Sequence, residues 1–256
     1  MTSMLSTGLR AALYLGLAAT LSAFDHSHAA FDGVLKRDVR DGLVDYSALK
    51  AAPRALDDYL ATLAAVPEAE FKAWSEPQRF AFLINLYNAA TLRLILDHYP
   101  LKSIRSIGWL PGAAWKKEGV ALFGSKVSLD HVEHGIIRKE YPDARAHFAL
   151  VCAALGCPPL RSEAFVAERL DAQLTDQGRV FLGDPAKNRV EAATRTVHLS
   201  AIFKWFAGDF EASAGTVVKF ATPFFPEAAR AALAAGGDFK IAYTDYDWSL
   251  NEQAKR

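Results

Sequence analysis

The two cysteines of the chain are five positions apart in one short segment, His147-Phe-Ala-Leu-Val-Cys152-Ala-Ala-Leu-Gly-Cys157-Pro-Pro. A thiolate is a strong nucleophile, and a neutral imidazole is well suited to accept a proton near pH 7. Together they predict nucleophilic attack on a carbonyl carbon, with a histidine as general base. Cys157 is the preferred nucleophile because it precedes a predicted helix start near Ser162, where the helix dipole stabilises a thiolate. Cys152 is the alternative thiol.

The sequence leaves the pairing of thiol and imidazole open. A strand is expected over residues 146–152, and its alternation places His147 and Cys152 on opposite faces. Cys157 reaches His147 only if the loop after Cys152 doubles back across about 17 Å of extended chain. His134 and His131 are therefore alternative bases.

Glu133 lies on a row of a predicted helix that otherwise faces the core. The helix is expected over residues 129–140, and the apolar members of this row are Leu129, Val132, Ile136 and Ile137. A buried carboxylate needs a partner. We expect Glu133 either to orient a catalytic histidine or to form a buried salt bridge with Arg138 or Arg93.

Two asparagines have a similar position on the helix that begins at Pro77. Asn88 continues an apolar row of that helix, and Asn85 lies close to it. Buried amides usually tie neighbouring segments together through hydrogen bonds. The alternative is that they hold the substrate or a developing oxyanion.

The spacing of the histidines and cysteines supports a metal site or a dithiol redox site less well than a cysteine–histidine hydrolase. His131, Glu133 and His134 do not form a His-Glu-x-x-His pattern, so no metal site is expected. Four residues separate the cysteines rather than two, which disfavours a thioredoxin-like site. A structural disulfide between Cys152 and Cys157 remains the alternative in an exported protein. Hydrolysis by a thiol needs no cofactor.

The first 29 residues are typical of a signal peptide. Arg10 precedes an apolar run from Ala11 to Phe24, and cleavage is predicted after Ala29 or Ala30. The run is shorter than the roughly 20 residues that span a bilayer, although an uncleaved anchor is an alternative. We therefore expect a periplasmic or secreted protein, with no stable membrane insertion after cleavage.

Residues 30–256 are expected to form one α+β domain. Helices are predicted over residues 47–66, 77–99, 129–140 and 161–182, with a short helix after Ser200 and one or two over 211–234. Hairpins are predicted over 120–129 and 188–199, and a last strand over 239–244. Strands and helices do not alternate regularly as in βαβ units, which favours a small antiparallel sheet packed with helices. The 29 basic and 29 acidic residues balance without a basic block, so nucleic acid is a poor candidate partner.

Five motifs in this order resemble the family catalogued as domain of unknown function 547. They are residues 82–89 (FLINLYNA), 129–135 (LDHVEHG), 147–159 with both cysteines, 200–206 (SAIFKWF) and 246–251 (YDWSLN). The resemblance implies an exported bacterial protein with a fold similar to papain-like and transglutaminase-like cysteine hydrolases. It also implies a Glu–His–Cys arrangement and binding of small thiol peptides such as glutathione.

The positions that match this arrangement are Glu133, His147 and Cys157, with Cys152 as the second thiol. The expected function is a cysteine-dependent hydrolase or amide-transfer enzyme acting on a small peptide or thiol compound. Cys157 attacks, His147 carries the proton, and Glu133 holds the imidazole. Asn88, Asn85 and His134 are expected to contact the substrate. The alternative is a non-catalytic module that binds such a peptide and holds its cysteines as a disulfide.

Overall fold

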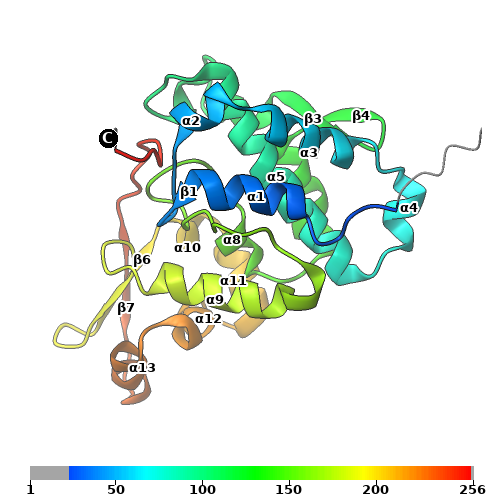
Figure 1. Ribbon diagram of the computed structural model, residues 1–256. Coiled ribbons are helices and arrows are strands. Elements are labelled where there is room, and N and C mark those ends of the chain that lie inside the picture. The colour runs from blue at the N-terminus through cyan, green and yellow to red at the C-terminus, as the bar shows by residue number, and fades with distance from the viewer. Residues whose placement is uncertain (1–22, 255–256) are drawn as a thin grey trace, which may run out of the picture.

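A computed structural model describes residues 23–254 of the chain (Figure 1). The fold is α+β, as predicted, with many helices and three small sheets among the described residues. Most of the predicted signal peptide, residues 1–22, lies outside the described residues.

The helices of the first half are α1 (Ala29–Asp38), α2 (Tyr46–Ala51), α3 (Arg54–Ala64), α4 (Glu68–Ala73), α5 (Glu76–His98), the 3₁₀ turn η1 (Ile104–Ser106), α6 (Ala113–Lys116), the π-helix η2 (His131–Ile137), α7 (Arg138–Glu140) and α8 (Ala146–Ala149). Those of the second half are η3 (Ala167–Arg169), α9 (Leu170–Leu182), α10 (Ile202–Trp205), α11 (Ala207–Ala214), α12 (Val217–Ala221), η4 (Thr222–Phe224) and α13 (Glu227–Ala234). The strands are β1 (Val39–Arg40), β2 (Leu43–Val44), β3 (Glu118–Leu122), β4 (Ser125–Ser128), β5 (Arg189–Glu191), β6 (Thr196–Ser200) and β7 (Lys240–Thr244).

Helix α5 is the centre of the larger core. Ser75 and Gln78 form a capping box at its start, and Pro77 occupies the first turn, where its missing N–H costs little. The helix is long and apolar enough to cross a bilayer, but 83% of its most apolar window is buried inside the protein. It is therefore a core helix, surrounded in Figure 1 by α1, α2, α3 and the β3–β4 hairpin.

The described residues bury two apolar clusters. The larger one packs the elements from α1 to β4 around α5, and the smaller one is rich in phenylalanine, including Phe148, Phe203 and Phe210. Phe148 belongs to the smaller cluster, whereas Leu150 and Cys157 belong to the larger one. The segment that carries the cysteines therefore passes from one cluster to the other.

Both predicted hairpins and the last strand are confirmed. β3 and β4 pair antiparallel, with the turn at Phe123 and Gly124, which both have positive φ. β6 lies between β5, to which it is antiparallel, and β7, to which it is parallel (Figure 1). This sheet lies next to the smaller, phenylalanine-rich cluster through Val197 and Leu199.

The predicted strand over residues 146–152 is wrong. Residues 146–149 form the short helix α8, which begins after a turn at Asp143, where the N–H of Ala146 donates to the Asp143 carbonyl. A short apolar run is compatible with a buried helix as well as a buried strand, so the alternation of faces inferred there does not apply. Two predicted helices also differ: Pro53 separates α2 from α3, and α9 begins only at Leu170.

The described end of the predicted signal peptide packs against the core. Phe24 stacks on Trp74 with ring centroids 5.1 Å apart. His28 is only 2% exposed, and its Nδ1 lies 2.7 Å from the hydroxyl oxygen of Tyr59. These contacts precede both predicted cleavage positions, so residues 24–28 belong to the folded unit in this structure.

Candidate active site

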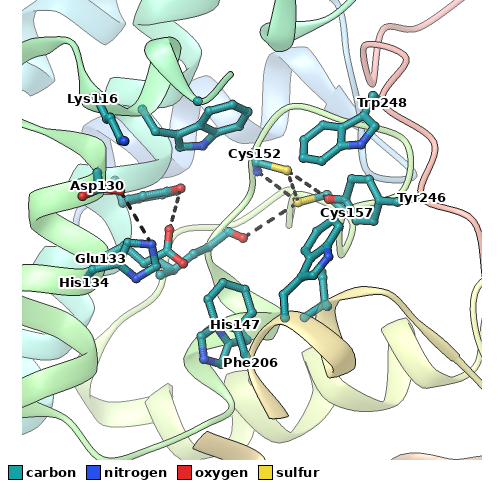
Figure 2. Close-up of a pocket in the computed structure, with 16 residues that line it drawn as sticks. Lys116, Asp130, Glu133, His134, His147, Cys152, Cys157, Phe206, Tyr246 and Trp248 are labelled. Carbon is teal, nitrogen blue, oxygen red and sulfur yellow. Dashed lines mark hydrogen bonds and ion pairs between the residues drawn. The ribbon is translucent and has the colours of Figure 1, made fainter. Parts of the chain in front are cut away.

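Both thiols face a cavity of about 250 Å³. Six aromatic side chains line it: Tyr87, Trp115, Trp205, Phe206, Tyr246 and Trp248. Figure 2 shows Cys152 and Cys157 beside Tyr246 and Trp248 on one side, with Glu133 and His134 on the opposite side. The cavity therefore has one end with sulfur and aromatic rings and another with ionisable groups.

The loop between the cysteines folds back on itself and brings the two sulfur atoms to 2.9 Å from each other, without a bond between them. Ala153 adopts a left-handed conformation with φ of 57°, and the N–H of Cys157 donates to the carbonyl of Ala154. Gly156 donates to the Asp247 carbonyl, and a Cβ at this position would lie 2.8 Å from the Asp247 nitrogen. The close approach of the two backbones therefore requires glycine at this position.

Cys157 is the thiol that ionises first. Burial opposes its ionisation, but hydrogen bonds from the thiol and the backbone N–H of Cys152 outweigh burial, so the pKa of Cys157 lies below its ordinary value. The same thiol–thiol hydrogen bond, together with burial, raises the pKa of Cys152 well above its ordinary value. The Cys152 sulfur also lies 3.0 Å from the hydroxyl oxygen of Tyr246. Of the two thiols, Cys157 is therefore the one that loses its proton more readily.

His147 is held by Asp209 of α11. Its Nε2 lies 2.8 Å from Oδ2 of Asp209, and its ring stacks on Phe206 with centroids 4.0 Å apart. Burial lowers the pKa of His147 to about 4, although the hydrogen bond to Asp209 acts in the opposite direction. Since the carboxylate can only accept, the neutral ring donates from Nε2 and keeps Nδ1 as its proton acceptor.

Asp209 is itself fixed by Arg138. The guanidinium of Arg138 contacts both carboxylate oxygens, at 2.7 and 2.8 Å, and these hydrogen bonds lower the pKa of Asp209 to about 2. Arg138 also donates to Nδ1 of His134 at 3.0 Å. Asp209 is therefore ionised near neutral pH, and the network joins α7, α11 and α8.

Glu133 makes no hydrogen bond with His147 but accepts one from Tyr87, at 3.0 Å. Its side chain comes from the π-helix η2, a helix type that occurs frequently at functional sites. Burial raises the pKa of Glu133, despite the lowering effect of His134 and the Tyr87 hydroxyl. The structure thus confirms the predicted burial of Glu133 but corrects its predicted pairing: Asp209 orients the imidazole, and Tyr87 binds Glu133.

Asn85 and Asn88 tie segments of the backbone together. Asn88 donates to the carbonyl of Ala149 and accepts from the N–H of Val151, at 2.9 and 3.0 Å. Asn85 makes the same two kinds of contact with Phe165. Neither lines the cavity, so these contacts agree with the expectation that buried amides tie segments together and not with substrate binding. Asn88 positions the chain immediately before Cys152.

The cavity brings together five of the seven predicted site residues: Cys157, Cys152, Glu133, His147 and His134. Among the described residues, no hydrogen bond joins either sulfur to an imidazole, and no group of three or more His, Cys, Asp and Glu side chains is placed to hold a metal ion.

Sequence reasoning missed Asp209 and Tyr246 as site residues. Asp209 lies between Phe206 and Phe210 in the sequence, and both rings pack on His147 in the structure. An acid between two aromatic residues was the only signal that the sequence offered. Tyr246 begins the last of the five motifs.

Residues 71–182 match the family model described as "Protein of unknown function, DUF547". This match supports the resemblance inferred from the motifs, and it covers Glu133, His147 and both cysteines. Comparison with curated proteins and with solved structures gave no match.

Proposed function

We propose that the chain is a cysteine-dependent hydrolase or amide-transfer enzyme that acts on a small peptide or thiol peptide. The main support is the position of Cys157, whose sulfur accepts hydrogen bonds from Cys152 beside a cavity that a neutral His147 also lines. The leader-like composition of residues 1–29 supports action in the periplasm or outside the cell.

The reaction begins when the Cys157 sulfur attacks the carbonyl carbon of a bound amide. His147 takes the thiol proton by way of a water molecule or the substrate in the cavity, and the ionised Asp209 stabilises the resulting imidazolium. The carbon–nitrogen bond then breaks, and the amine leaves with the proton from His147. Attack on the thioester by water gives hydrolysis, whereas attack by a second amine gives transfer.

The cavity wall favours a compact substrate with a sulfur-containing or apolar group. Tyr246 and Trp248 have ring centroids 4.5 Å apart, and Trp205 packs on both. Thiol and thioether groups make favourable contacts with aromatic rings. Lys116 and Asp130 line the opposite end and provide one positive and one negative partner for the termini of a short peptide.

The test is turnover of short peptides by the reduced protein, followed by mass spectrometry. The panel contains matched peptides with cysteine, methionine or alanine at one position, together with an amine acceptor for transfer. We expect turnover by the native chain and none by Cys157→Ala, while the exposed Lys126→Ala control keeps its activity. Equal turnover by native chain and Cys157→Ala would disprove the proposal.

The second candidate function is binding of the same peptide without turnover. It is favoured by one observation, that no imidazole of the described residues is hydrogen-bonded to either sulfur. Calorimetric titration measures peptide affinity and distinguishes the two candidate functions. A binding module leaves the peptide unchanged after the titration, and its affinity is the same whether or not the Cys157 thiol is free.

A further inference from the structure

The second sulfur of the site has no role in the proposed hydrolysis. Cys152 lines the cavity together with Cys157, and the two sulfur atoms are 2.9 Å apart. A thiol that only filled core space would not need to face both a cavity and a second thiol. The pair therefore has the geometry of a dithiol in which one sulfur can attack the other after the first has reacted.

We propose that Cys152 and Cys157 perform thiol–disulfide exchange with small disulfide compounds that enter this cavity, and that the product is a Cys152–Cys157 disulfide. In the hydrolase of the previous section this product lacks the free nucleophile, so the exchange regulates that activity; only this consequence rests on the proposed function.

The exchange proceeds in two balanced steps. The Cys157 thiolate attacks one sulfur of a disulfide RS–SR, a Cys157–SR bond forms, and the S–S bond of the compound breaks to release RS⁻. Cys152 loses its proton to this leaving group or to solvent, and its sulfur attacks the Cys157 sulfur. The second RS⁻ leaves and is protonated. Two protein thiols are oxidised to one disulfide, and RS–SR is reduced to two RSH.

The contacts of the two sulfurs assign the order of attack. The Cys157 sulfur accepts the N–H of Cys152 at 3.0 Å, a contact that stabilises a negative charge on Cys157. The Cys152 sulfur lies beside the Tyr246 hydroxyl and is the more exposed of the two. Because the thiolate is the attacking species in exchange, Cys157 reacts first and Cys152 closes the disulfide.

The loop between the cysteines holds the pair close for the second step. The N–H groups of Leu155 and Gly156 donate to the carbonyls of Ser249 and Asp247, both at 2.8 Å. The loop is therefore anchored on the C-terminal segment at its middle. Formation of the disulfide shortens the sulfur–sulfur distance from 2.9 Å to about 2.05 Å.

The experiment treats the reduced full-length protein with bis(2-hydroxyethyl) disulfide, a small neutral probe, and follows the intact mass. We expect the native chain to lose two hydrogen atoms and to retain no hydroxyethylthio group. Cys152→Ser is expected to stop at one hydroxyethylthio group on Cys157. Cys157→Ser is expected to react at Cys152 at least about tenfold more slowly, because burial still disfavours the Cys152 thiolate, and the backbone N–H that stabilises a charge on Cys157 points to position 157. Circular dichroism checks that both variants are folded.

The order of attack can also be measured on the native chain, without any variant. Quenching early time points with iodoacetamide and mapping the peptides should find the first hydroxyethylthio group on Cys157. A native chain that keeps both thiols after prolonged incubation, or that carries its first adduct on Cys152, overturns the proposal. Peptide turnover measured in parallel tests the hydrolase separately, since exchange can succeed in a protein that hydrolyses no peptide.

Discussion

Nε2 of His147 lies 2.8 Å from Oδ2 of Asp209, although 62 positions separate the two residues in the chain. The contact fixes which nitrogen of the imidazole carries the proton, and Arg138 keeps the carboxylate ionised. It also distinguishes the structure from the arrangement expected from sequence, in which Glu133 holds the ring. The roles of Asp209 and Glu133 can therefore be distinguished by experiment.

Replacement of Asp209 by asparagine should reduce peptide turnover much more than replacement of Glu133 by glutamine. The amide introduced by Asp209→Asn can present a donor to Nε2 and so favour the wrong tautomer, an effect on the order of 10²- to 10⁴-fold in kcat at comparable sites. The Glu133→Gln side chain can still accept the hydrogen bond from Tyr87. Steady-state kinetics of both variants check this, and an equal or larger loss for Glu133→Gln would restore the arrangement expected from sequence.

Stability should rise with pH between about 4 and 6.5. Burial lowers the pKa of His28 and of His147 to about 4, whereas an unfolded histidine titrates near 6.5. Between these values the unfolded chain binds more protons, so acidification favours unfolding. Each histidine contributes on the order of 3 kcal/mol, fully present above pH 6.5 and lost as pH falls towards 4. Glu133, with its raised pKa, acts in the opposite direction.

The measurement is urea unfolding of the native chain, His28→Gln and His147→Gln at pH 4.5, 5.5 and 7. Each variant should show a smaller slope of unfolding free energy against pH than the native chain, because one buried histidine no longer titrates. Parallel slopes in all three proteins would show that neither imidazole is held neutral.

Asn88→Ala should destabilise the protein and disturb the thiols without touching the cavity. The substitution leaves the Ala149 carbonyl and the Val151 N–H without their partner, which costs about 1–3 kcal/mol for each buried group. Denaturant unfolding measures the loss, and the alkylation rate of Cys157 reports whether the segment before Cys152 has moved. Asn85→Ala is the matched control, since it should lower stability while leaving the Cys157 rate unchanged.

Removal of residues 24–29 should lower stability. Phe24 stacks on Trp74, and His28 forms a hydrogen bond with the Tyr59 hydroxyl. A chain that starts at Ala30 therefore exposes the ring of Trp74 and leaves Tyr59 without this partner. We expect a melting temperature several degrees below that of a chain that starts at Phe24. N-terminal sequencing of the protein purified from the cells that produce it then tests whether processing retains these residues. Equal melting temperatures would contradict the expectation.

Trp205→Ala should weaken substrate binding with little effect on folding. The side chain is 49% exposed, and it packs on Tyr246 and Trp248 at the cavity wall. We expect KM to rise by about tenfold, equivalent to about 1.4 kcal/mol of lost contact, while the melting temperature changes little. Trp109→Ala, at a fully exposed tryptophan that does not line the cavity, is the control. A fall in kcat with unchanged KM would be contrary to this role.

The sequence by itself determined the elements that local pattern specifies. Pro77 and an apolar row predicted α5, turn residues predicted both hairpins, and burial of Glu133 followed from helical spacing. The cysteine segment was ambiguous because a short apolar run fits a buried helix and a buried strand equally, so the faces of His147 and Cys152 were assigned wrongly.

Only the tertiary structure decided which of these groups meet. The left-handed turn at Ala153 and the anchoring of Gly156 on Asp247 bring the two sulfurs together, and the packing of α11 on α8 brings Asp209 to His147. Such contacts depend on how distant segments pack, which periodicity does not encode. Spacing therefore identified the groups capable of chemistry, while the partner of each group was set by the packed chain around the cavity.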